Sequence, residues 1–442
     1  MRIWAYILAL AFLFPLRLSG VEKPNIIYIL ADDLGYGDLA CYGNKLHKTP
    51  NIDRLANRGV MMTDFHASPW CAPSRRALMT GCHPNRPWGK GFSKLASSQT
   101  IAEMLKSNHY QTAIIGKWHL EMGKGLHPLD QGFDYWFGTR GSNDWDGPRP
   151  NYSSFKNAPE SECKTPYYIN RNRAGIIKQS EITGTYTEKA IEFIEEHSKR
   201  PFFLYLAHNM PHVPVFASKP FQGKSLNGVY GDVIEELDWS TGEVLKSVQN
   251  LGIEERTIII FTSDNGPWKM FREFGGFSSP LRGEKSTTWE GGERVPCIMY
   301  WPGVIKPYIN DGFMMNYDWY ATFASLTHSR LMSGEAIDSI DMSEALLQGK
   351  PSHRRHHVFY QRQAMAYRKG DFKIHFYTRD RTRDPISGKQ EPSIKQTPPL
   401  LFNLKHDVAE NVNVAHQYPQ LVDQLTKEFE MAKKAIQNWE KF

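Results

Sequence analysis

The sequence lacks a second long hydrophobic run, an internal repeat and any low-complexity block. After the first 20 residues no segment approaches 18 consecutive apolar residues, which excludes a protein with several membrane spans. With 40% hydrophobic and 23% charged residues and no biased segment, the chain is expected to fold as a globular protein. The net charge is only +6, which suits an anionic substrate and a neutral one equally, and we expect no nucleic-acid partner.

The N-terminal segment has the layout of a secretory signal peptide. Met1-Arg2 supplies positive charge, Ile3–Leu16 is almost wholly apolar, and Ser19-Gly20 offers small residues before a polar stretch. We therefore expect residues 1–20 to be removed and the protein to be periplasmic or secreted, with no stable membrane insertion. The alternative is a membrane anchor, for which the apolar run is short. Because no cysteine follows the run, a lipoprotein is disfavoured.

Cysteine is scarce, and its count is odd. An odd number of cysteines in an exported chain indicates one thiol with separate chemistry. If Cys71 is that thiol, the other four allow three disulfide pairings, and four unpaired cysteines are at least as compatible with the sequence. These four residues are Cys41, Cys82, Cys163 and Cys297.

Short apolar runs alternate with amphipathic stretches along the first three quarters of the chain. The runs are too short for helices and rich in β-branched and aromatic residues, which predicts buried strands at Ile26–Ala31, Thr112–Ile115, Phe202–Ala207 and Thr257–Thr262. Apolar spacing between them predicts helices at Ile52–Arg58, Ile101–Asn108, Thr187–Glu196 (with Thr187 as N-cap) and Val233–Gln249. This alternation predicts an α/β fold with a large, mostly parallel sheet sandwiched by helices.

The pattern changes around Asp338–Gln348. Three strand-like pieces follow, and then a polar, proline-rich loop from Thr378 to Pro399 and an amphipathic helix from Pro419 to about Lys441. The strand-like pieces are Val358–Tyr360, Ala364–Tyr367 and Phe372–Tyr377. We expect residues 21–345 to form the α/β domain and residues 346–442 a smaller C-terminal subdomain, an antiparallel sheet plus a helix.

Polar clusters follow all four predicted strands. They are Asp32-Asp33, Gly116–His119, His208–His212 and Ser263–Gly266. In open α/β sheets, ligands bind in the crevice beyond the carboxyl ends of the strands. Three carboxylates brought together there would repel unless a cation neutralised them. Asp32, Asp33, Asp264 and the amide oxygen of Asn265 form an all-oxygen set, which suits calcium or magnesium. Each cluster alone is also compatible with turn or helix-capping chemistry.

The segment Cys71–Gly81 (CAPSRRALMTG) is the most informative part of the chain. Pro73 at the start of a helical stretch places Cys71 at or just before a helix N-terminus, where anionic groups are favoured. The segment resembles the maturation signature of the formylglycine-dependent type I sulfatases, the arylsulfatase family of the alkaline phosphatase superfamily.

Further blocks resemble this family in its own order over nearly all of the chain after residue 20. They are Pro24–Asp38, Thr49–Ala56, Gly116–Leu120, Pro211–Pro214, Ser263–Gly266, Leu281–Lys285, Trp289–Pro296 and Leu401–Asn411. The resemblance implies an alkaline-phosphatase-like fold and a sulfuric ester hydrolase. The chain departs from the pattern at Cys82, where the family often has arginine, at Glu121, where it often has glycine, and at His406–Glu410, which lacks the usual Asp-Pro.

The resemblance also implies how the nucleophile and the metal arise. Cys71 would be oxidised by a formylglycine-generating maturation enzyme to formylglycine (3-oxoalanine), whose hydrated aldehyde is the nucleophile. Asp32, Asp33, Asp264 and Asn265 would hold one calcium ion, with the matured residue 71 as a further ligand.

The remaining roles concern charge and protons. Arg75 and Lys117 would stabilise the hydrated aldehyde, and His119 would take a proton from its second hydroxyl, expelling sulfate. His212 and Lys285 would contact the sulfate ester, with His212 as general acid towards the departing alcohol. Fixed cations would stabilise the charge that sulfuryl transfer spreads over the sulfate oxygens.

The substrate is indicated only by class. Ser142-Asn143-Asp144 resembles the arylsulfatase A and N-acetylgalactosamine-6-sulfatase branch, which implies a sulfated carbohydrate, with galactose or N-acetylgalactosamine types favoured. Candidate sugar-binding residues, equally compatible with a role as loop anchors, are Arg140, Asp144, Trp145, Arg149, Arg171 and Arg173. The stretch His353–Arg383 is strongly basic and is either a surface for an anionic polysaccharide or a solvated face.

Two other functions fit parts of the pattern. A phosphodiesterase or phosphonate monoester hydrolase of the same superfamily would share the metal cleft. A catalytically silent carbohydrate-binding pseudoenzyme is disfavoured, because all ten core positions keep reactive residue types.

Overall fold

The computed structural model describes residues 23–86, 99–146, 156, 158–331, 334, 336–381, 383 and 389–438. The expected signal peptide lies outside these residues. Within them, no helix is long and apolar enough to cross a membrane. All five cysteines are described, and none forms a disulfide.

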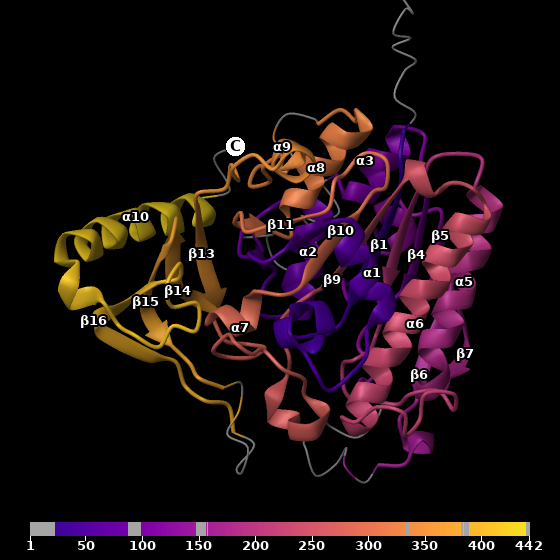
Figure 1. Cartoon of the computed structure of the whole chain (residues 1–442), viewed down its shortest axis with the longest axis horizontal. Coiled ribbons are helices and arrows are strands. Elements are labelled where there is room, and N and C mark those ends of the chain that lie inside the picture. Colours follow the sequence, from indigo (N-terminus) through magenta and orange to yellow (C-terminus); the bar gives the residue numbers. More distant parts are fainter. Residues whose placement is uncertain are drawn as a thin grey trace, which may run out of the picture.

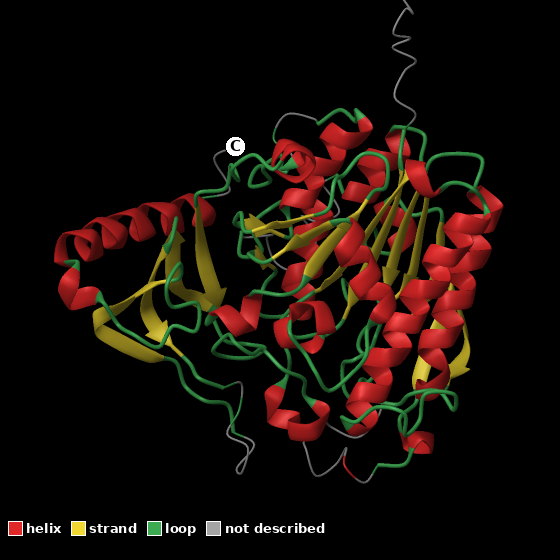
Figure 2. Ribbon diagram, viewed as in Figure 1, coloured by secondary structure: helices red, strands yellow, loops and turns green. Residues whose placement is uncertain are grey.

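A ten-stranded sheet forms the centre of the molecule (Figures 1 and 2), in the order β11-β2-β10-β9-β1-β8-β4-β5-β6-β7. Its central strands are parallel, and antiparallel pairs lie towards both edges. The bounds are β1 Asn25–Ala31, β2 Val60–Met62, β4 Gln111–Gly116, β5 Tyr135–Gly138, β6 Thr165–Ile169, β7 Asn172–Ile177, β8 Phe202–Ala207, β9 Thr257–Ser263, β10 Cys297–Tyr300 and β11 Tyr308–Asn310. The predicted α/β class and all four predicted strands are confirmed.

Helices cover both faces of this sheet. Because successive side chains of a strand point to opposite faces, Ile27 and Ile29 of β1 pack with helices α1, α5 and α6, whereas Tyr28 and Leu30 pack with α2, α3 and α8. The bounds are α1 Pro50–Arg58, α2 Cys71–Thr80, α3 Ile101–Ser107, α5 Ile182–His197, α6 Gly228–Asn250, α7 Glu290–Glu293, α8 Asp318–Thr327 and α9 Ser343–Gln348. A two-stranded sheet pairs β3 (Phe65–His66) with β12 (Met314–Met315).

One predicted helix start is wrong. Thr187 lies inside α5, which begins five residues earlier at Ile182. Its hydroxyl donates to the carbonyl of Thr183 and contacts Ser240 Oγ of α6, at 2.7 and 2.6 Å. The hydroxyl therefore joins two packed helices rather than capping one.

The C-terminal sheet lies beside the large sheet and is covered by helix α10, Pro419–Gln437 (Figure 1). It is antiparallel, in the order β13 (His356–Gln361), β14 (Gln363–Lys369), β15 (Phe372–Thr378) and β16 (Ile394–Asn403). The predicted small antiparallel sheet plus helix is confirmed. The end of the predicted loop Thr378–Pro399 instead belongs to β16. This strand tolerates Pro398 and Pro399 because it lies at the sheet edge.

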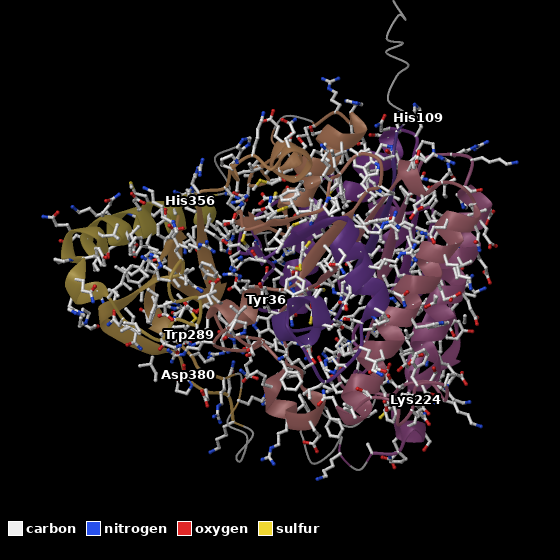
Figure 3. The ribbon with its side chains drawn as sticks, in the orientation of Figure 1. Tyr36, His109, Lys224, Trp289, His356 and Asp380 are labelled. Atoms are coloured by element: carbon white, nitrogen blue, oxygen red, sulfur yellow. The ribbon has the colours of Figure 1, made fainter. Side chains whose placement is uncertain are left out.

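The two sheets meet at a buried group of charges, here called the junction cluster. Glu290 of α7 accepts from Lys373 of β15 at 2.8 Å and lies 3.0 Å from His66 Nε2. Glu410 lies within 3.3 Å of Lys373 and 2.7 Å from His375 Nε2. Asp64 completes the cluster in a bidentate pair with Arg368 of β14 at 2.8 and 2.6 Å. Near this cluster, Figure 3 labels Trp289 and Asp380, joined by a 3.0 Å hydrogen bond across the junction.

Candidate active site

The predicted site residues converge beyond the carboxyl ends of β1, β4, β8 and β9. β1 pairs with β8 and β9, and β4 pairs with β8, so the segments that follow these strands are neighbours. Gly116, the last residue of β4, has φ +114°, and a Cβ there would lie 1.8 Å from the carbonyl oxygen of Ala207. Only glycine permits this close approach, which brings Lys117 to the end of β8.

Three buried carboxylates and three buried cations form the centre of the site. Lys285 Nζ donates to both oxygens of Asp33, at 2.7 and 2.8 Å. Arg75 Nε donates to Asp264 Oδ2 at 2.8 Å. Lys117 Nζ pairs with Asp32. The structure therefore brings together the residues that the sequence singled out as metal ligands and charge partners.

The arrangement of oxygen atoms fits a divalent cation. Oxygen atoms of Asp32, Asp33 and Asp264 and the sulfur of Cys71 all lie within 4.8 Å of one another. Asp32 Oδ1 and Asn265 Oδ1 are buried without a hydrogen-bond partner. Buried polar atoms are normally satisfied, so two unpartnered oxygens beside three carboxylates indicate a place for a cation with oxygen ligands, such as calcium.

Cys71 is the first residue of α2, as expected, and its side chain is only 3% exposed. Its sulfur lies 3.6 Å from Asp33 Oδ1. Burial and the carboxylates of Asp264 and Asp32 raise the pKa of this thiol well above its usual value. The unmodified side chain is therefore held as the protonated thiol and not as the nucleophilic thiolate.

The charges in the site act strongly on one another. Although burial opposes ionisation, Lys117, His212 and Arg75 lower the pKa of Asp32 well below its usual value. Burial and then the Asp32 carboxylate raise the pKa of Asp264 to about 7. Asp264 therefore ionises less easily than a free carboxyl group, and a bound divalent cation would favour its ionised form.

Two histidines lie near this centre. Burial, Lys117 and Arg75 lower the pKa of His119 well below its usual value, so its ring is neutral. His212 Nδ1 lies 2.6 Å from the carbonyl oxygen of Val213, which can only accept, so Nδ1 carries the proton. His212 Nε2 therefore faces Asp33, at 3.7 Å from Oδ2.

A polar cavity beside Lys117 holds several of the candidate sugar-binding residues. Trp145, Arg140 and Arg173 line it, together with Ser142, Lys164 and Tyr168. Trp145 is 49% exposed and lies edge-on to His119, with ring centroids 5.2 Å apart. The Arg140 guanidinium lies 5.2 Å from the Trp145 ring centroid.

The other candidates are placed differently. Asp144 is half-buried, and its Oδ1 has no hydrogen-bond partner. Arg171 is exposed, forms an ion pair with Asp130 at 2.5 Å and does not line this cavity. Arg149 lies outside the described residues.

The candidate set omitted two residues of the centre. Ser142 Oγ accepts from Lys117 Nζ at 2.8 Å. The Trp268 ring lies 4.3 Å from Lys285 Nζ and 5.6 Å from the His212 ring. Ser142 belongs to a segment that the sequence did single out. Trp268 follows the Ser263–Gly266 cluster within two residues, which was the only available signal.

Two family models match the chain. The model described as Sulfatase matches residues 24–329, and the C-terminal region of aryl-sulfatase matches residues 352–441. These matches cover both the large sheet and the C-terminal sheet.

Curated relatives and a solved structure agree with the family models. Arylsulfatase A of Bos taurus is 36% identical over 470 aligned positions, covering 98% of this chain and 91% of its own. N-acetylgalactosamine-6-sulfatase of Homo sapiens is 37% identical, covering 81% and 72%. The crystal structure of the PsFucS1 sulfatase from Pseudoalteromonas sp. superposes with a TM-score of 0.83 at 30% identity, covering 94% and 90%. The predicted alkaline-phosphatase-like fold is thereby confirmed. The chain belongs to the sulfatase family and is a sulfuric ester hydrolase.

Proposed function

We propose that this sulfatase removes sulfate from a sulfated carbohydrate, using a formylglycine made from Cys71 and one calcium ion. The observation that carries the proposal is the convergence of Asp32, Asp33 and Asp264 on Cys71 at a helix N-terminus. An anionic group is stabilised at such a terminus.

Calcium would be held by the oxygens of Asp32, Asp33, Asp264 and Asn265, with residue 71 as a further ligand. Its support is the all-oxygen donor set and the two unpartnered buried oxygens. When bound, calcium supplies positive charge that polarises a sulfate oxygen. The hydrated aldehyde of formylglycine would provide the nucleophilic oxygen at residue 71. Arg75 and Lys117, which already contact this group of carboxylates, would hold that oxygen in place.

Proton transfers are assigned from the environments of the two histidines. The lowered pKa of His119 keeps its ring neutral at rest, so a ring nitrogen with a lone pair would be available to accept a proton near residue 71. His212 presents Nε2 to the site, and its imidazolium form would donate the Nε2 proton to the departing alcohol while Nδ1 keeps the proton that it donates to the Val213 carbonyl. Lys285 remains cationic, because Asp33 raises its pKa although burial opposes this, and it would bind a sulfate oxygen.

The cavity with Trp145 is proposed to bind the sugar. An exposed aromatic face next to guanidinium groups suits a hydroxylated ring carrying charge. The relatives named for arylsulfatase A and N-acetylgalactosamine-6-sulfatase support a substrate of the galactose or N-acetylgalactosamine type. Arg140 and Arg173 line this cavity, whereas Arg171 is engaged with Asp130. Asp144 and Arg149 remain candidates.

Export and domain limits complete the proposal. We propose cleavage after about residue 20, a periplasmic or secreted protein, and domains spanning 21–345 and 346–442. Formylglycine formation requires a maturation enzyme as a partner.

The test combines chemistry at residue 71 with substrate preference. Mass spectrometry of the tryptic peptide holding residue 71 should show conversion of cysteine to the aldehyde. The same preparation should release sulfate from 4-nitrophenyl sulfate and from N-acetylgalactosamine 6-sulfate or galactose 6-sulfate. Faster turnover of a phosphodiester or phosphonate monoester would instead favour the related hydrolases. Sugar binding without any turnover would favour a pseudoenzyme.

A further inference from the structure

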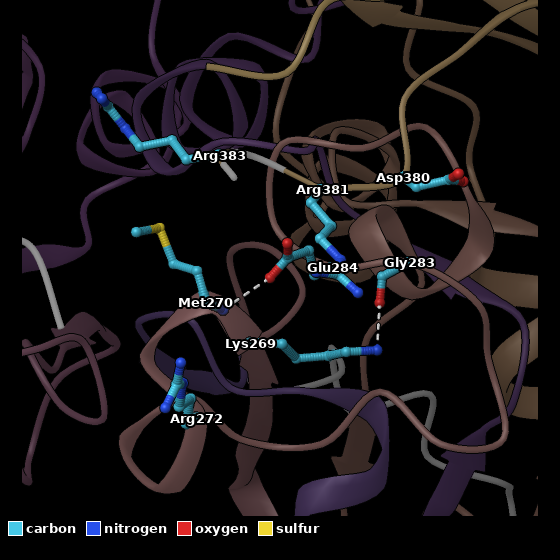
Figure 4. Close-up of a pocket in the computed structure, with 8 residues that line it drawn as sticks. All are labelled: Lys269, Met270, Arg272, Gly283, Glu284, Asp380, Arg381 and Arg383. Carbon is cyan, nitrogen blue, oxygen red and sulfur yellow. Dashed lines mark hydrogen bonds between the residues drawn. The ribbon is translucent and has the colours of Figure 1, made fainter. Parts of the chain in front are cut away.

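A second cavity, of about 370 Å³, lies between the two sheets beside the active site (Figure 4). One wall comes from the segment after β9 and the other from residues 380, 381 and 383, which follow β15. Its volume is in the range of pockets that bind small molecules. The charged lining residues are Lys269, Arg272, Glu284, Asp380, Arg381 and Arg383.

The cavity carries an excess of positive charge. Four of its lining residues are cationic and two are acidic. Asp380 is already occupied, because it accepts from Arg282 and from Trp289 Nε1, each at 3.0 Å. Arg282 lies outside the lining, so this carboxylate contributes little towards neutralising the cavity.

Two of the cations, Lys269 and Arg381, lie close enough to repel each other. Lys269 Nζ donates to Ser278 Oγ and to the carbonyl oxygen of Gly283, at 3.2 and 3.1 Å, and both acceptors are uncharged. Partial burial lowers the pKa of Lys269, and although Glu284 opposes this, Arg381 lowers it further. A lysine and an arginine that repel each other within a cavity are both stabilised by an anion between them.

Two residues that line the cavity are sequence neighbours of residues in the proposed active site. Glu284 immediately precedes Lys285, whose amine contacts Asp33. Lys269 immediately follows Trp268, whose ring faces Lys285 and His212. Consecutive Cα atoms are about 3.8 Å apart, so one wall of the cavity is built from residues adjacent to the catalytic groups.

We propose that this cavity is a second anion subsite, which binds a sulfate or carboxylate on the sugar unit next to the one that is desulfated. The inference rests on the proposed carbohydrate sulfatase function and adds that the substrate carries at least two anionic groups. Arg381 is the principal ligand, because a guanidinium binds sulfate or carboxylate through two parallel hydrogen bonds. The subsite would also give the end of the basic stretch His353–Arg383 a role in binding an anionic substrate.

The experiment compares one-anion and two-anion probes as inhibitors of 4-nitrophenyl sulfate hydrolysis. N-acetylgalactosamine 6-sulfate is paired with a chondroitin 6-sulfate disaccharide, which adds a carboxylate. Galactose 6-sulfate is paired with a disulfated galactose disaccharide. In the wild type, the two-anion member of at least one pair should bind about tenfold more tightly, as expected for one added charged hydrogen-bond pair.

Arg381→Ala should abolish this advantage, and Arg381→Lys should keep part of it. Arg330→Ala, which removes an exposed arginine outside the cavity, should leave it unchanged. Equal inhibition by both members of every pair in the wild type would overturn the subsite, as would an undiminished advantage in Arg381→Ala. Calorimetric titration of the same probes measures their binding without relying on turnover. Absence of sulfate ester turnover would refute the proposed function, whereas the ratio of the two binding affinities would still decide whether the subsite exists.

Discussion

The active-site centre and the junction cluster contain the same kinds of groups but arrange them differently. Both hold buried acidic residues that lie close enough together to ligate a metal ion. In the junction cluster, Glu290 and Glu410 share Lys373, and Asp64 is held by Arg368. In the active-site centre, Asp32 Oδ1 and Asn265 Oδ1 are buried and accept no hydrogen bond, and the Arg75 guanidinium lies 3.8 Å from Asp32 Oδ1.

The difference separates a structural network from a binding site. The junction cations meet the carboxylates of the other sheet, so folding itself completes the network. The active-site centre keeps unsatisfied oxygens and two non-glycine residues with positive φ, Asp33 at 65° and His119 at 55°. Such strain persists where the surrounding fold enforces it, and it is concentrated at functional sites. Within a buried group of acidic residues, oxygens that accept no hydrogen bond are therefore the feature that indicates a metal site.

The largest expected effect comes from removing the nucleophile. Cys71→Ala should reduce sulfatase turnover by at least about 10⁴-fold, because loss of a nucleophile removes the covalent route. Thermal unfolding should stay close to that of the wild type. Cys71→Ser should be active only in a host whose maturation enzyme accepts serine. Substantial turnover by Cys71→Ala would contradict the formylglycine proposal.

The next prediction compares the effect of calcium on variants of the active-site centre and of the junction cluster. At a free calcium concentration 100 times the Kd, calcium should stabilise the wild type by about 2.7 kcal/mol, and chelation should remove this gain and the activity. Asp264→Asn should abolish both the calcium-dependent rise in Tm and turnover. Glu290→Gln changes a carboxylate of the junction cluster and should keep the calcium-dependent rise. A calcium response lost in Glu290→Gln but retained in Asp264→Asn would reverse our assignment.

A third prediction concerns the stability that the junction cluster provides. Lys373→Met leaves the buried Glu290 and Glu410 without their shared cation and should lower the free energy of unfolding by about 3–5 kcal/mol. The matched control is Lys369→Met on the neighbouring strand, where the lysine is exposed and pairs with Glu428. That change should cost less than about 1 kcal/mol. Urea denaturation measures both, and similar losses would show that burial is not what distinguishes the pairs.

A fourth prediction separates proton donation from binding. His212→Ala should reduce turnover of a sugar sulfate by about 10²-fold but should affect 4-nitrophenyl sulfate much less, because an activated leaving group needs little protonation. His119→Ala should impair both substrates. Equal losses on the two substrates for His212→Ala would refute its role as the acid, and Lys285 would then be the next candidate.

The smallest expected effect, a change in stability per pH unit, concerns the titration of His83 beside the C-terminal sheet. Burial lowers the pKa of His83 to about 4, and its Nε2 lies 3.0 Å from the carbonyl oxygen of Val358 in β13. Between about pH 6.5 and pH 4 the unfolded chain binds a proton at this residue that the folded chain does not, so stability falls as the pH falls. The contribution should be at most about 1.4 kcal/mol per pH unit.

His83→Gln provides the comparison for this pH dependence. It should reduce the slope of the unfolding free energy against pH between pH 6.5 and pH 4.5, measured by urea denaturation at each pH. An unchanged slope would show that the titration of His83 is not coupled to folding.

The sequence predicted what depends on local pattern. The apolar runs identified β1, β4, β8 and β9, and the polar residues that follow them identified the metal and catalytic candidates. Such clusters meet because neighbouring parallel strands end at the same edge of a sheet. The family resemblance then implied the nucleophile, the metal and the proton-transfer roles, which the spacing of apolar residues could not indicate.

What the sequence could not predict depends on contacts between distant segments. Glu410 Oε2 accepts from the backbone N–H of Glu290, 120 residues away in sequence, and no local spacing indicates that pairing. The strand β16 was hidden because proline usually argues against a strand, and only its edge position explains the exception. Arg171 and Arg173 were indistinguishable in sequence, yet only Arg173 lines the cavity beside Lys117.

The burial of Cys71 limits the time during which its side chain is accessible for modification. The maturation enzyme that we propose would need access to this side chain, and the folded chain exposes only 3% of the residue's surface. Arg75, one turn further along α2, is held by Asp264, which lies 189 residues downstream. The closed site therefore cannot form until the ribosome has made that later strand. The proposed oxidation of Cys71 would therefore take place before that strand is made, or on a chain that has not yet folded.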